Sequence, residues 1–217
     1  MGENYEVQVE SVIRSAEQLF EIGSSIASEL KSAYVIISRL GESRYWIGNQ
    51  YDKVIDSLNN HLDSLNALIS KATSSVPQTL SAAAQNYAAG DGISVRGANL
   101  SYVAPIEHCI KTSHMTGEVV FKYAEIENAR EAFSNHFKQV DNFISNYTSK
   151  FNEICNTDWI GSAMEQFRSE IQSFATNAAS ASAEINTTIT TEIVNSQEAL
   201  RGAESNTESI ASQVNAN

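Results

Sequence analysis

The chain has 217 residues, of which 26 are acidic and 14 are basic, giving a formal net charge of −12. This balance leaves no general phosphate-binding face and argues against nucleic-acid and anionic-membrane partners. With 42% hydrophobic residues the chain can bury a core, and its 2 prolines and 10 glycines are too few for an all-β fold, which needs frequent turns.

Two apolar seams near the N-terminus predict a helical hairpin. The first runs over 12–40 with alternating four- and three-residue steps, which is typical of an amphipathic helix. Gly41 follows it and predicts a left-handed helix end. The second seam runs over 51–76, where Pro77 predicts a kink or a restart, and the connection over 41–48 is tight. The first seam consists of Val12, Ala16, Leu19, Gly23, Ile26, Leu30, Ala33, Ile37 and Leu40, and the second of Tyr51, Ile55, Leu58, Leu62, Leu65, Ile69, Ala72 and Val76.

Helical periodicity fails between Gly90 and about Glu118, where glycines and Pro105 interrupt the pattern. The segment is nevertheless not polar, so we expect it to dock against the helical core as a strap rather than to form a free tether. The residues expected to face the core are Ile93, Leu100, Tyr102, Val103, Ile106 and Ile110.

Two further seams, over 126–154 and 164–193, repeat the arrangement of the first half. After Leu200 the residues are small and polar, so we expect a frayed tail. All four periodic segments are helical in spacing and none alternates with period two, which predicts an all-α fold. The expected division is a first hairpin over 1–91, a strap over 92–117, a second hairpin over 118–203 and a frayed tail over 204–217.

The chain's two tryptophans stand in the same tripeptide, Trp46-Ile47-Gly48 and Trp159-Ile160-Gly161, 113 positions apart (159 − 46). Glycine lets the backbone turn sharply, and a tryptophan can fill the end of a hairpin core. One copy alone would indicate an ordinary helix-connecting turn, whereas two copies in two similar hairpins indicate a repeated unit. Helix-capping pairs follow both turns: Asn49 with Asp52, and Ser162 with Glu165.

At these motifs the sequence resembles the WxG family, the small early-secreted-antigen-like proteins of bacterial type VII secretion. Members form a helical hairpin with Trp-x-Gly at the bend and pair as antiparallel dimers into four-helix bundles. The resemblance covers roughly 5–90 and 118–200 and implies two WxG hairpins fused in one chain, packed antiparallel into an elongated four-helix bundle. Self-pairing within one chain then favours a monomer over a swapped dimer. The fusion and its strap depart from single-unit members.

The family's second motif, Tyr-x-x-x-acid just beyond the second helix, is matched by Tyr87 and Asp91. In the family's antiparallel arrangement these two residues would lie near Trp159 and Gly161. The resemblance therefore implies one composite export signal. The same spacing recurs at the start of the third expected helix, where the family does not use it, in Tyr123 and Glu127.

The resemblance implies a leaderless substrate or targeting partner of type VII secretion. Such a protein is made in the cytoplasm and exported without a signal peptide to the cell surface or medium, either alone or with a larger co-secreted effector or toxin. Its direct partner would be the secretion ATPase. The N-terminus lacks the basic region and following apolar run of a secretory signal peptide. The sequence contains no run of 18 apolar residues, so we expect no transmembrane helix. The alternative is a cytosolic helical-bundle scaffold or interaction protein that is not exported.

We find no pattern for catalysis, and we predict no enzyme, cofactor or metal. His108, Cys109 and His114 cluster in the strap, but without the paired spacing of a metal site. Cys155 and His136 lie elsewhere in the sequence, and no phosphate-binding glycine loop is present.

Overall fold

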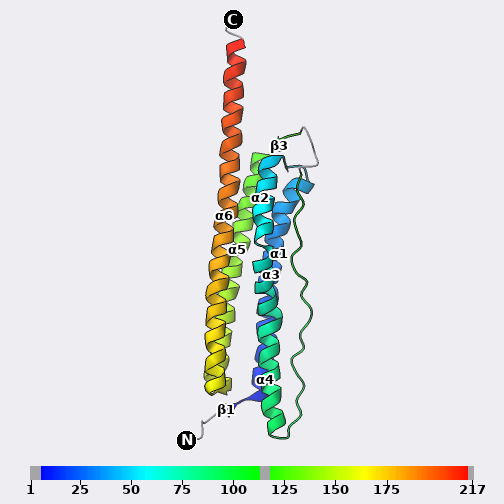
Figure 1. Ribbon diagram of the computed structural model, residues 1–217, viewed down its shortest axis with the longest axis vertical. Helices are drawn as coiled ribbons and strands as arrows, with labels where there is room; N and C mark the ends of the chain where they lie inside the picture. Colours follow the sequence, from blue (N-terminus) through cyan, green and yellow to red (C-terminus); the bar gives the residue numbers. More distant parts are fainter. Residues whose placement is uncertain (1–5, 113–117, 215–217) are drawn as a thin grey trace.

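The computed structural model describes residues 6–112 and 118–214. The protein is all-α, with helices forming 80% of it, as the periodicity predicts. The long helices run along one common axis, so the molecule is elongated (Figure 1).

The chain forms two helical halves joined by an extended strap. The first half contains α1 (Val9–Glu42), α2 (Asn49–Asn60), α3 (Leu62–Ser70), the π-helix η1 (Lys71–Ser75) and α4 (Val76–Gly90). The second half contains α5 (Tyr123–Glu153), the π-helix η2 (Ile154–Asp158) and α6 (Ser162–Val214). Within the described residues, four two-residue strands lie beside the helix ends: β1 (Glu6–Val7), β2 (Trp46–Ile47), β3 (Val120–Phe121) and β4 (Trp159–Ile160).

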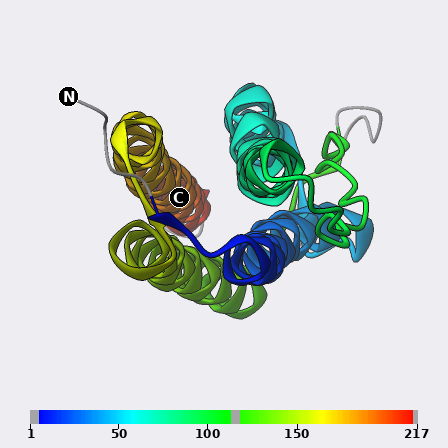
Figure 2. The same cartoon turned by 90° about the horizontal axis from the view of Figure 1, so that it is seen from below.

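The helices surround a single core. Seen along the axis, α1 lies next to α5 and α4, and α6 lies next to α5 and α2 (Figure 2). Neighbouring helices run in opposite directions, so the turn between α1 and α2 and the turn between α5 and α6 lie at opposite ends of the molecule (Figure 1).

The expected seams form this core. Leu19, Ile37 and Leu58 from the first half and Phe133 and Ile189 from the second are fully buried. Burying each such side chain stabilises the fold by about 1.5–3 kcal/mol, so the seams supply the main driving force for packing.

The prediction that α1 ends at Gly41 is wrong. The helix continues to Glu42, and the left-handed residue after it is Arg44, with φ of 55°. Gly41 instead permits close packing, because a Cβ there would lie 2.7 Å from the Tyr51 hydroxyl oxygen and 2.8 Å from its ring carbons. The Tyr51 hydroxyl donates a hydrogen bond to the Ser38 carbonyl at 3.2 Å.

At Pro77, where a kink or a restart is expected, the chain stays helical but passes through the π-helix η1 into α4, which leaves one carbonyl without a donor in its own helix. In η1 the Val76 N–H donates to the Lys71 carbonyl, one residue further back than in an α-helix. The next carbonyl in this register, that of Ala72, would need a donor at Pro77, which has no N–H. The buried Tyr147 hydroxyl of α5 donates to it instead, at 3.1 Å.

Replacing Tyr147 with phenylalanine should lower the free energy of unfolding by about 1–3 kcal/mol, because the Ala72 carbonyl would remain buried without a donor. Burial also raises the pKa of the Tyr147 hydroxyl, so it stays a donor across the neutral range. Urea unfolding followed by circular dichroism measures the loss. Tyr102→Phe is the matched control, because Tyr102 is 85% exposed; equal midpoints for both variants would contradict the assigned hydrogen bond.

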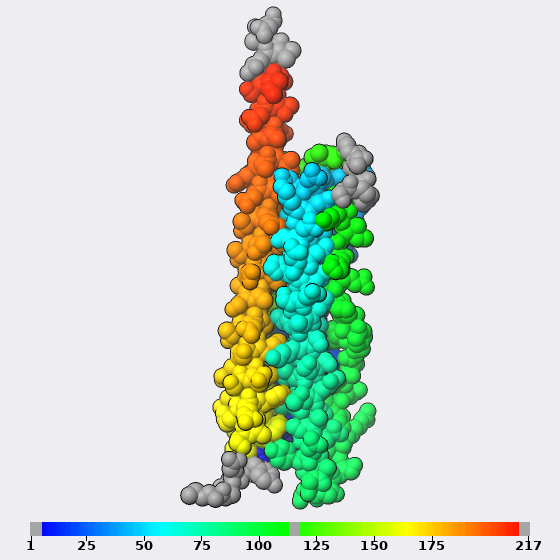
Figure 3. Space-filling model, viewed as in Figure 1, coloured from blue at the N-terminus to red at the C-terminus, as the bar shows by residue number. Residues whose placement is uncertain are grey.

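The expected frayed tail is also corrected, because α6 stays helical to Val214 and extends past the other helices (Figures 1 and 3). Its side chains over 201–212 are exposed. Extending an existing helix avoids the cost of nucleation, and no proline interrupts the segment. Residues 215–217 lie outside the described part of the chain.

Candidate functional site

Each Trp-Ile-Gly turn is held by the opposite half of the molecule. Strand β4 pairs antiparallel with β1, which aligns Trp159 with Val7. Strand β2 pairs antiparallel with β3, which aligns Trp46 with Phe121. In both pairs, the residue that follows the partner strand, β1 or β3, adds one more backbone hydrogen bond. The Gln8 N–H donates to the Asp158 carbonyl at 2.7 Å, and the Lys122 N–H donates to the Tyr45 carbonyl at 2.9 Å.

Both tryptophans fill the ends of the core, with exposed fractions of 1% for Trp46 and 4% for Trp159. The Trp46 ring makes edge-to-face contacts with Tyr51 at 5.7 Å and Phe121 at 5.3 Å between centroids. Such contacts add stability beyond the buried area.

The turn glycines are needed for their backbone geometry. Gly48 has φ of 125° and Gly161 has φ of 152°, values that a residue with a side chain rarely adopts. The sharp turns expected from the tripeptides are therefore present at both positions.

The structure brings Tyr87 and Trp159 together. Tyr87 lies in the last turn of α4, and its ring contacts Trp159 edge-to-face, with 5.6 Å between centroids. The buried Trp159 Nε1 has no hydrogen-bond partner among the described residues, so the ring is held by packing. Asp91 follows the end of α4 and is exposed, and its N–H donates to the Ala88 carbonyl at 3.1 Å. Tyr87, Trp159 and Gly161 thus gather at one end, with the Asp91 carboxylate in the solvent beside the end of α4.

The opposite end is built differently. Next to Trp46, the Phe121 ring contacts Tyr123 at 4.6 Å, and the Arg201 guanidinium lies 5.0 Å from the Tyr123 ring centre. Glu127 forms an ion pair with Arg130, whose hydrogen bond lowers the pKa of the Glu127 carboxyl. Tyr123 therefore makes aromatic contacts, and Glu127 an ion pair, within the second half.

The first predicted helix cap is replaced by a contact with the strap. The N-cap of α2 is Gly48, not Asn49, and a glycine has no side chain that could bond to the first N–H groups of the helix. The Asp52 carboxylate accepts hydrogen bonds from the Thr112 N–H at 2.6 Å and the Thr112 hydroxyl at 3.2 Å. The same hydroxyl accepts the Gly48 N–H at 3.1 Å, so a strap residue caps this helix.

The strap docks along the first half, as expected, but half of its predicted contact residues are wrong. Ile106 is buried, whereas Ile93, Tyr102 and Ile110 are 54%, 85% and 73% exposed. An extended chain turns successive side chains to different sides, so only some can face the helices. The half-buried members of the predicted set are Leu100 and Val103.

The cysteines and histidines do not assemble into a reactive site in the described residues. Burial raises the pKa of the Cys109 thiol to about 11, which keeps it protonated at neutral pH. His108 is exposed, and His136 forms a 2.6 Å contact with Glu29. Within 6–112 and 118–214 no three His, Cys, Asp or Glu side chains gather as metal ligands, and His114 lies outside these ranges.

No helix in the described ranges is both long and apolar enough to cross a bilayer. Comparisons with protein families, curated proteins and solved structures give no match.

Proposed function

We propose that the protein is a substrate or targeting partner of type VII secretion, made in the cytoplasm and exported to the cell surface or medium. In this proposal residues 1–91 and 118–203 are two WxG hairpins, joined by the strap over 92–117 and packed antiparallel as an elongated four-helix bundle. The partner is the secretion ATPase, and export takes place alone or with a larger co-secreted effector or toxin. The observation that supports this best is the edge-to-face contact between Tyr87 and Trp159.

The four residues of the proposed signal have different roles. Trp159 is 4% exposed, so a partner reaches little of its ring. Tyr87 is half-buried and Asp91 is exposed, so these two offer the accessible ring edge and carboxylate. We propose that Trp159 and Gly161 position Tyr87 through the shape of the turn, and that Asp91 makes the direct contact with the ATPase.

Asp91→Ala should abolish export while leaving the melting temperature nearly unchanged. An exposed carboxylate contributes under about 1 kcal/mol to folding, so its loss should not unfold the protein. The measurement is the amount of intact protein in the culture supernatant of a host with a working type VII system, compared with the amount in the cell lysate. Thermal unfolding of the purified variant shows whether the fold is retained.

Glu127→Ala is the control, because it removes the carboxylate of the other Tyr-x-x-x-acid pattern at the opposite end of the molecule. It loses an ion pair with Arg130 but should be exported at the wild-type level. Wild-type export of Asp91→Ala would contradict the composite signal. Export from a strain without the secretion ATPase would contradict the route, and retention of the wild-type protein in the cell would favour the cytosolic scaffold.

A further inference from the structure

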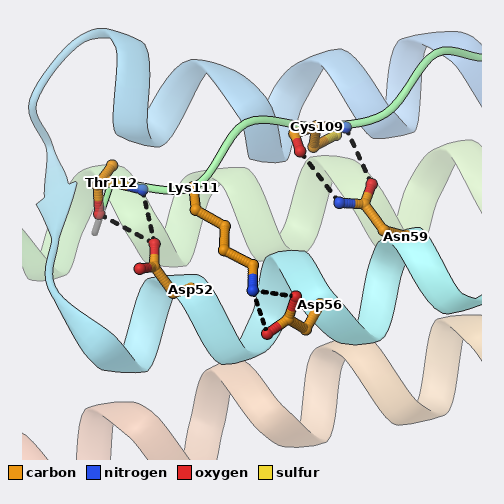
Figure 4. A network of polar contacts seen from close by, with 6 residues as sticks. All are labelled: Asp52, Asp56, Asn59, Cys109, Lys111 and Thr112. Atoms are coloured by element: carbon orange, nitrogen blue, oxygen red, sulfur yellow. Dashed lines mark hydrogen bonds and ion pairs between the residues drawn. The ribbon is translucent and has the colours of Figure 1, made fainter. Parts of the chain in front are cut away.

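Two asparagines of the first half bind the strap as a neighbouring β-strand would. The Asn59 side-chain amide donates to the Cys109 carbonyl at 3.0 Å and accepts the Cys109 N–H at 2.9 Å. The Asn66 amide makes the same pair of bonds with Ile106, at 3.1 and 2.8 Å. Each amide thus satisfies both backbone polar groups of one strap residue, as in a strand ladder. Figure 4 shows the Asn59 pair beside the contact of Asp52 with Thr112.

These contacts share a register that follows from helix and strand dimensions. Asp52, Asn59 and Asn66 are spaced by seven residues, and their partners Thr112, Cys109 and Ile106 are spaced by three. Seven residues of helix rise about 10.5 Å, and three residues of extended chain rise about 10 Å. Each pair of helical turns therefore meets one three-residue step of the strap. We call these three helix residues and their three strap partners the clasp.

Contacts outside the clasp hold the rest of the strap to the first half. Nearer its start the Ala98 N–H donates to the Ser81 hydroxyl at 2.9 Å, and the Asn99 N–H donates to the Glu17 carboxylate at 2.8 Å. Near its end Lys111 forms an ion pair with Asp56 (Figure 4). Most of these bonds involve strap backbone atoms, so the surface recognises an extended chain more than particular side chains.

The clasp lies directly before the segment that leads to the second half. Thr112 is fixed beside Asp52. Glu118, the next residue that the structure describes, forms an ion pair with Arg44 of the same first half. The intervening segment, 113–117, can span only about 20 Å even when fully extended. The molecule is about two helix diameters, or roughly 20 Å, wide, so a path around it to another copy is longer than this span.

We propose that the clasp prevents two copies of the chain from exchanging their second halves. While the strap is bound, the second half packs on its own first half. When the strap leaves α2 and α3, the whole strap becomes available as a hinge, and a swapped dimer can form. This inference concerns assembly and does not depend on the proposed export.

The first test is the double variant Asn59→Ala/Asn66→Ala, with Asn60→Ala/Asn86→Ala as a matched control at exposed positions. In hydrogen exchange, the strap amides that the clasp binds should exchange at least about tenfold faster in the first variant, while the helix amides stay protected. After refolding at high protein concentration, light scattering should show dimers for this variant and monomers for the control and the wild type. Circular dichroism verifies that both variants fold.

Three outcomes would overturn the proposal. The first is that the clasp variant stays monomeric although its strap amides exchange fast. The second is that its strap amides stay as protected as in the wild type. The third is that the wild type itself forms dimers while its strap stays protected.

A second test changes the register without removing the asparagines. One glycine inserted between Glu107 and His108 lengthens a clasp step from three residues to four and should produce the same dimers. One glycine inserted between Ser101 and Tyr102 lies outside the clasp steps and should leave a monomer. Equal behaviour of the two insertions would show that the register does not matter.

Discussion

Replacing either tryptophan with alanine is expected to lower the free energy of unfolding by about 3–5 kcal/mol, the usual cost of removing a large buried aromatic side chain. Trp46 and Trp159 are almost completely buried, and each lies where one half's turn meets a strand of the other. Each variant should therefore lose packing within its own half and between the halves. The measurement is the urea midpoint of the two single variants.

Tyr102→Ala serves as the control for aromatic loss, because Tyr102 is 85% exposed and should change the midpoint little. Trp159→Phe should cost much less than Trp159→Ala, since it keeps a ring and the indole N–H it removes has no partner among the described residues. A negligible loss for both alanine variants would rule out the packing role of the tryptophans.

Gly23→Ala is expected to destabilise the protein by about 1–3 kcal/mol, although alanine normally favours a helix over glycine. Gly23 lies in the middle of α1, and a Cβ there would lie 2.6 Å from the Ala72 carbonyl oxygen. This oxygen also accepts the Tyr147 hydrogen bond, so it cannot move without disturbing a contact between the two halves. Thermal and urea unfolding should both show the loss.

At Gly202 the same substitution is not expected to destabilise the protein. Gly202 lies in the exposed extension of α6, and a Cβ there would meet nothing within 4 Å. Gly202→Ala should increase helicity at 222 nm and leave the unfolding midpoint unchanged or higher, because only helix propensity acts there. A stabilising Gly23→Ala would contradict the close contact between α1 and η1.

The candidate site was predictable in part, because some of its features repeat in the sequence. The pair of Trp-Ile-Gly tripeptides marks both turns, whereas the expected position of Tyr87 near Trp159 came from the resemblance to the WxG family, whose antiparallel packing implies it. The polar residues that bind the strap carried no such signal. Asp52 fits a helix cap equally well, and Asn59 and Asn66 resemble ordinary solvent-facing residues until the extended chain lies beside them.

The sequence by itself determined the helices, because apolar side chains at helical spacing can be buried along one face whatever the partner helix is. It also determined the turns, since glycine at Gly48 and Gly161 permits backbone angles that other residues avoid. Only the tertiary structure decided the contacts that join distant segments: the short strands at Trp46 and Trp159, and the tight packing at Gly41. These depend on which backbone groups and empty spaces lie next to each other after the halves pack, and local residue preferences do not encode that information.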